Sequence, residues 1–79
     1  MAKEMRSFSL SIYKKEAIEE AMHAYASYAR FSVQEESYAL LVEIEPLYEQ
    51  HAIQIIDSFC NHVLFETIVI HRKEQGGSL

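Results

Sequence analysis

The 79-residue chain has few of the residues that build crosslinked or loop-rich folds: two glycines, one proline, one cysteine and no tryptophan. With Cys60 alone, no disulfide can form within the chain, and no cysteine pair has the spacing of a zinc site. Scarce glycine and proline argue against a long irregular framework. We therefore expect one small domain of regular elements over 1–79, with frayed ends at about 1–6 and 74–79.

Positive charge is also scarce, since 7 Lys and Arg stand against 12 Asp and Glu, a formal net charge of −5. Nucleic-acid binding relies on clustered Lys and Arg, so nucleic acid is not the expected partner. No apolar run approaches the roughly 20 residues of a membrane span, because Glu66 and His71 interrupt the longest one. Charges near the N-terminus do not fit a signal peptide, and we expect a cytoplasmic protein.

Apolar residues, by contrast, make up 49% of the chain and aromatic residues 11%, which is enough for a folded core. A chain of this length nevertheless buries only about 60–65% of the surface that its unfolded form exposes. We therefore expect a homo- or hetero-oligomer, formed by dimerisation or by docking on a larger partner.

The N-terminal half begins with alternating apolar and polar residues, which predict a strand over 7–13 with Ile12 on its inward face. The apolar period then changes to three and four, which predicts an amphipathic helix of about four turns from about 14 to 29. On this interpretation Tyr28 and Ala29 still lie on the apolar stripe of the helix.

Alternation returns over 30–46 and predicts two strands joined by a turn at 34–37. Tyr38 would lie on the inward face of the second strand, whereas Leu41 would lie on the opposite face, where packing does not explain it. Pro46 would end that strand, because proline cannot donate a hydrogen bond to the ladder.

Apolar residues at helical spacing predict a last helix of five or more turns from Leu47 to about Lys73. The β-branched run at 67–70 could equally form a short fourth strand. The element order is β-α-β-β-α, and its simplest packing is an α+β fold in which both helices cover one face of a three-stranded sheet.

No set of side chains predicts catalysis or a bound metal. Cys60 and His62 are two residues apart, which on a helix separates them by about 200°, so they cannot form a nucleophile–base pair. The four histidines and Cys60 never reach ligand spacing within a predicted element. Glu19–Glu20 and Glu35–Glu36 fit solvated surface pairs. We therefore expect a protein that is not an enzyme and needs no cofactor.

Two stretches match the motifs of a known family. The first is 8–13, FSLSIY, followed by Lys15-Glu16-Ala17-Ile18 and an alanine-rich helix with tyrosines; the second is 59–66, FCNHVLFE. Together they resemble the His-Xaa-Ser system protein HxsD, a small bacterial family. Asn61 matches the asparagine of the family signature and Phe59 is a conservative match, whereas His62 replaces an acidic residue and Glu66 stands where the family has Arg.

The resemblance implies a non-catalytic companion of radical SAM enzymes that modify a ribosomally made peptide, with the enzyme or the precursor peptide as its partner. Any iron–sulfur cluster would belong to that enzyme, because clusters need about four cysteines. The element order also resembles Pcc1-like subunits, which dimerise and organise a tRNA-modifying complex, although no motif selects that alternative.

The last predicted helix is apolar on two sides and so needs two neighbours. One neighbour would be the sheet with the first helix. The other would be a second copy or the modifying enzyme, contacted by Phe59, Asn61, Phe65 and Glu66. In the alternative, Asn61 bonds locally and the first helix covers the second apolar side.

Overall fold

The fold was examined in a computed structural model that describes residues 3–76, with side chains placed up to Glu74. Its elements are β1 (Glu4–Ser9), α1 (Lys15–Ala24), β2 (Ala29–Glu35), β3 (Ala39–Pro46), a 3-10 turn η1 (Glu49–His51) and α2 (Ala52–Gly76). The predicted β-α-β-β-α order of an α+β fold is therefore confirmed.

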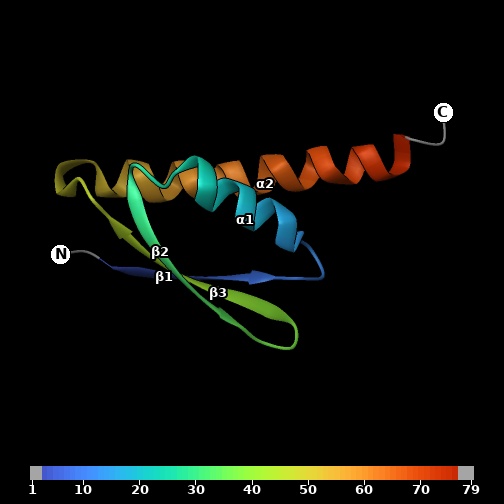
Figure 1. Ribbon diagram of the computed structural model, residues 1–79, viewed down its shortest axis with the longest axis horizontal. Coiled ribbons are helices and arrows are strands. Elements are labelled where there is room, and N and C mark those ends of the chain that lie inside the picture. The colour runs from blue at the N-terminus through green and yellow to red at the C-terminus, as the bar shows by residue number, and fades with distance from the viewer. Residues whose placement is uncertain (1–2, 77–79) are drawn as a thin grey trace.

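The three strands form one antiparallel sheet in the order β1-β3-β2, so β3 is central. Leu40 and Ile44 of β3 are buried. Phe8 of β1 lies opposite Leu40, and Phe31 of β2 lies opposite Ile44, so all four share one face of the sheet. Both helices cover this face, as predicted (Figure 1).

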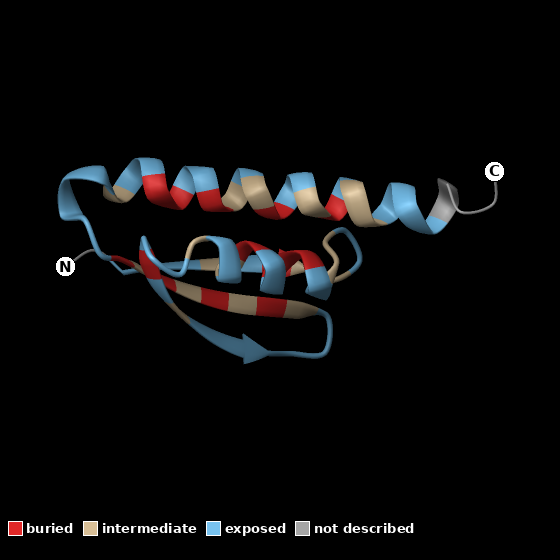
Figure 2. Ribbon diagram, turned by 45° about the horizontal axis from the view of Figure 1, so that its top comes forward, coloured by how far each residue is buried: buried red, intermediate tan, exposed pale blue. Residues whose placement is uncertain are grey.

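Phe59 of α2 lies at the centre of the core and is fully buried. Its ring centroid is 4.7 Å from that of Phe31 and 6.1 Å from those of Phe8 and Tyr25. Burial of such a side chain stabilises the fold by about 1.5–3 kcal/mol. Figure 2 shows buried residues on only one side of α2, the side that faces the sheet and α1.

The first strand begins three residues and ends four residues earlier than predicted, since β1 is Glu4–Ser9 and not 7–13. Its partner β3 fixes these bounds, because Glu4 pairs with Ile44 at one end and Ser9 with Ala39 at the other. Beyond Ser9 the chain turns, and Ile12 is exposed in that turn rather than on the inward face of a strand.

The first helix ends at Ala24, whereas the apolar stripe predicted a helix to 29. Tyr28 lies in a turn and is half-exposed, and Ala29 is the first residue of β2, where it pairs with Pro46. Pairing with β3 therefore overrides the local helical period. Pro46 is the last residue of its strand, as predicted.

The hairpin of β2 and β3 is confirmed, but its turn lies at 36–38 and not at 34–37. Glu35 still pairs with Leu40, and the Glu36 N–H donates to the Ala39 carbonyl oxygen at 2.9 Å. Tyr38 lies in the turn and is 85% exposed, so its predicted inward position is wrong.

The predicted last helix is confirmed, although it begins at Ala52 after η1 rather than at Leu47. It continues through 67–70, so these residues form helix and not a fourth strand. The expected frayed ends are shorter than predicted, because 4–6 belong to β1 and 74–76 to α2. Residues 1–2 and 77–79 lie outside the described part of the chain.

Candidate partner-binding surface

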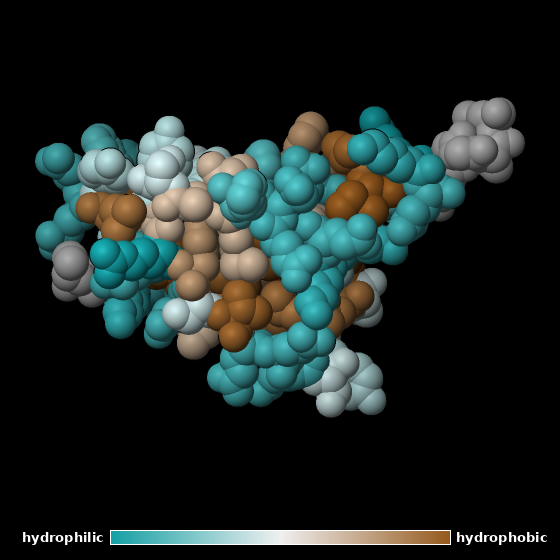
Figure 3. Space-filling view, viewed as in Figure 1, coloured by the Kyte–Doolittle hydropathy of each residue, from teal (hydrophilic) through white to brown (hydrophobic). Residues whose placement is uncertain are grey.

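The side of α2 that faces away from the core carries large apolar side chains. Leu64 is 45% exposed, Phe65 58% and Ile68 44%, and the exposed Asn61 lies among them. Spacings of three, four and seven residues put these side chains on one helical stripe, called here the outer stripe (Asn61, Leu64, Phe65 and Ile68). Figure 3 shows hydrophobic atoms at the surface beside the C-terminal half of α2, among hydrophilic ones.

The structure separates the four residues predicted to contact a partner. Asn61 and Phe65 lie on the outer stripe. Phe59 is in the core and offers no exposed surface, which corrects its assignment: two residues of helix turn it about 200° away from Asn61. Glu66 is half-buried on the flank towards α1, where its Oε2 lies 3.4 Å from His62 Nε2.

A groove lies beside the outer stripe, between the turn after β1 and the C-terminal half of α2. Its volume is about 540 Å³. Its apolar lining includes Leu10, Ile12, Leu64 and Ile68. Ile12 is 66% exposed. Sequence patterns could not indicate this groove, because only the folded chain brings the turn against α2.

Basic side chains surround the groove, although the whole chain is acidic. Lys14, His71 and Arg72 line it, and Lys14 Nζ lies 3.0 Å from Glu74 Oε1. A different groove, between α1 and α2, has four glutamates in its lining with one lysine and one histidine: Glu16, Glu19, Glu20, Glu66, Lys73 and His23. Positive charge is therefore gathered beside the apolar groove, which suits a ligand with an apolar side chain and a nearby carboxylate.

Cys60 and His62 do not form a catalytic pair in the fold. Burial raises the pKa of the Cys60 thiol, and the Arg6 guanidinium beside it only partly opposes this shift. His62 lies with its ring 5.6 Å from that of Tyr25 and next to Glu66. Among the residues that the structure describes, no group of three or more His, Cys, Asp or Glu is placed to hold a metal ion.

The segment Glu49–Glu74, which contains most of α2, is long and apolar enough to cross a membrane by length and composition. The sequence alone had indicated no such segment, because charged residues and His71 interrupt its apolar runs. In the fold, Ile55, Phe59 and Val63 of this segment are buried against the sheet and α1. Its apolar character is thus partly that of a core helix.

The chain was compared with models of protein families, with curated proteins and with solved structures, and none of the three comparisons finds a match. The geometry of the outer stripe and the groove is therefore the basis for a functional assignment.

Proposed function

We propose that this chain is a non-catalytic accessory protein that binds a partner protein through the outer stripe and the adjoining groove. The observation that carries the proposal is the exposure of Ile12, Leu64 and Ile68 in the lining of one groove, with the exposed Phe65 beside them on the outer stripe. The core side of α2 is already fully used by the domain itself. Exposed apolar side chains gathered in this way mark interaction sites.

The groove favours a peptide segment of the partner as the bound element. Its volume of about 540 Å³ suits one or two apolar side chains, and its walls supply Leu10, Ile12, Leu64 and Ile68 for them. Lys14 and Arg72 at its rim would pair with an acidic residue beside the apolar anchor. The bound segment is therefore an apolar residue flanked by Asp or Glu.

Residues 8–18 and 59–66 resemble the HxsD family, which supports the proposal that the partner belongs to a radical SAM peptide-modification system. The partner would be the modifying enzyme or its precursor peptide. The free thiol of Cys60 fits the reducing cytoplasm in which we place the protein. The alternative function, that of a dimerising subunit of a tRNA-modifying complex, is supported only by the β-α-β-β-α order of the elements.

A nuclear magnetic resonance titration tests the proposal. The isotope-labelled chain is titrated with candidate partners chosen from the genes that neighbour its own: a purified radical SAM enzyme and, separately, a precursor peptide. We expect one of them to shift the resonances of Ile12, Leu64, Phe65 and Ile68 more than those of the core residue Val63. A titration that shifts no resonance with either probe, or shifts only residues far from the groove, contradicts the proposal.

A further inference from the structure

The sheet has two edge strands, β1 and β2, and the free backbone groups of each follow from its hydrogen bonds to β3. The Glu36 N–H donates to the Ala39 carbonyl and the Leu47 N–H donates to the Tyr28 carbonyl, both at 2.9 Å. At both ends of β2, the backbone N–H and carbonyl groups of even-numbered residues therefore point towards β3. Neighbouring residues of a strand point their backbone groups in opposite directions. The backbone groups of the odd-numbered residues therefore point away from β3, and these residues are Ala29, Phe31, Val33 and Glu35.

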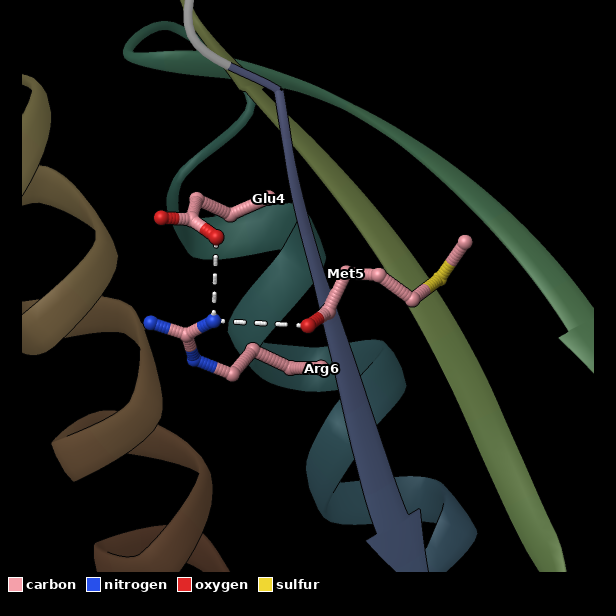
Figure 4. Close-up of polar contacts among 3 residues, drawn as sticks. All are labelled: Glu4, Met5 and Arg6. Atoms are coloured by element: carbon pink, nitrogen blue, oxygen red, sulfur yellow. Dashed lines mark hydrogen bonds and ion pairs between the residues drawn. The ribbon is translucent and has the colours of Figure 1, made fainter.

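The edge of β1 is partly closed by its own chain, although within residues 3–76 the outward backbone groups of Ser7 make no hydrogen bond. The Leu10 N–H donates to the Tyr38 carbonyl, so the outward groups of β1 belong to odd-numbered residues. The Ser9 carbonyl accepts two N–H groups of the turn that follows. The Met5 carbonyl accepts a bond from Arg6 Nη1 at 3.3 Å (Figure 4). An outward carbonyl that already accepts a hydrogen bond from a charged side chain is less available to another strand.

The edge of β2 is open. Within residues 3–76, the outward backbone groups of Phe31, Val33 and Glu35 make no hydrogen bond. Figure 2 shows most of β2 as exposed, in contrast to the alternating burial of β3. A groove of about 760 Å³ runs beside this edge, with Met22, Phe31 and Val33 in its lining. An edge strand of this kind readily accepts another strand.

The charges of β2 are complementary to those of a second copy. Arg30 lies near the start of the strand and Glu36 directly follows its end, and both side chains are on the same face of the sheet. With a two-fold axis at Ser32, antiparallel pairing of two β2 strands puts Arg30 of one copy opposite Gln34 of the other and diagonally next to Glu36, at both ends. It also brings Phe31 and Val33 of the two copies together as an aromatic–β-branched contact.

We propose that β2 pairs antiparallel with β2 of a second copy of this chain, about a two-fold axis near Ser32, which is the middle residue of Ala29–Glu35. The two three-stranded sheets then form one continuous sheet. Such an isologous contact is closed and gives a dimer. The proposal is independent of the partner-binding groove, because the groove at α2 and the strand β2 share no residue.

Sedimentation velocity over about 1 to 100 µM protein tests the dimer. The parent chain is expected to dimerise, and Val33→Pro, which removes an outward N–H of β2, to raise the dissociation constant at least about ten-fold. Ser7→Pro is the matched control, because it removes an outward N–H of β1 and should leave the dimer intact. Circular dichroism establishes that each variant is folded.

A charge exchange gives a second test that does not depend on proline. Arg30→Glu should weaken the dimer about ten-fold, and Glu36→Arg added to it should restore association. A parent chain that is monomeric at every concentration overturns the proposal. So does a dimer that Val33→Pro and Arg30→Glu leave intact but that Ile68→Glu on the outer stripe dissociates.

Discussion

Arg6 Nη1 donates a hydrogen bond to the carbonyl oxygen of Met5, the residue before it, and so covers an outward group of β1. The same nitrogen lies 3.3 Å from Glu4 Oε2, which helps to hold the guanidinium at this edge (Figure 4). Within residues 3–76, no side chain donates an equivalent hydrogen bond to an outward carbonyl of β2. The two edges of one small sheet are therefore chemically different, and among the described residues β2 has the longer run of outward groups without a hydrogen bond.

Removal of the Arg6 side chain is expected to open the second edge. Arg6→Ala should convert the proposed dimer into larger oligomers whose size increases with protein concentration, because each subunit then offers two free edges. Sedimentation velocity measures the size distribution. Arg30→Ala, which removes an arginine from the other edge, should weaken the dimer without producing larger species. If Arg6→Ala remains a simple dimer, Arg6 does not close this edge.

Phe59 is buried in the core whereas Phe65 lies on the outer stripe of α2, and their alanine variants are expected to behave differently. Phe59→Ala should lower the free energy of unfolding by about 3–5 kcal/mol, because it empties the centre of the core. Phe65→Ala should change it by less than about 1 kcal/mol, because the side chain is largely exposed. Urea denaturation measures both values. Equal losses would show that Phe65 belongs to the core.

The Cys60 thiol is expected to react slowly with a disulfide reagent in the folded chain. Burial raises its pKa, so at pH 8 a smaller fraction is thiolate than in the unfolded chain. Arg6→Ala should slow the reaction further, since the guanidinium lowers this pKa. The reaction rate in buffer and in urea measures the difference. Equal rates in the two conditions would contradict a raised pKa.

The same shift predicts how stability depends on pH. A raised pKa means that the folded chain holds the thiol proton more tightly than the unfolded chain does. Its contribution to stability is therefore complete below the unfolded pKa of about 8.5 and is lost as the pH rises through the folded value. Urea midpoints of the parent and of Cys60→Ala, measured on both sides of this range, should converge at high pH. Parallel curves would contradict this linkage.

The sequence predicted the kinds of elements better than their ends. Alternation and helical spacing are local properties, so the strands, the hairpin and the long helix were found correctly. The ends depend on distant pairing: the polar residues 4–6 join β1 only because β3 lies beside them, and Ala29 leaves the predicted helix to pair with Pro46.

The candidate surface was predicted only in part, for a similar reason. Helical spacing showed that α2 has two apolar sides, and Asn61 and Phe65 were correctly expected on a side away from the sheet. It did not show that Phe59 belongs to the side that the sheet covers. Ile12 was missed because it reaches the groove beside Ile68 through a turn that ends β1 earlier than the alternation indicated.

The affinity of two isoleucine variants for the partner tests the account most directly. Ile68→Glu puts a charge in the groove, whereas Ile53→Glu puts the same charge on α2 at a position 74% exposed and outside the groove. Calorimetry with whichever neighbouring enzyme or precursor peptide binds the parent gives both dissociation constants. We predict that Ile68→Glu weakens binding about ten- to one hundred-fold and that Ile53→Glu changes it less than about two-fold. Equal affinities for the two variants would contradict partner binding at this surface.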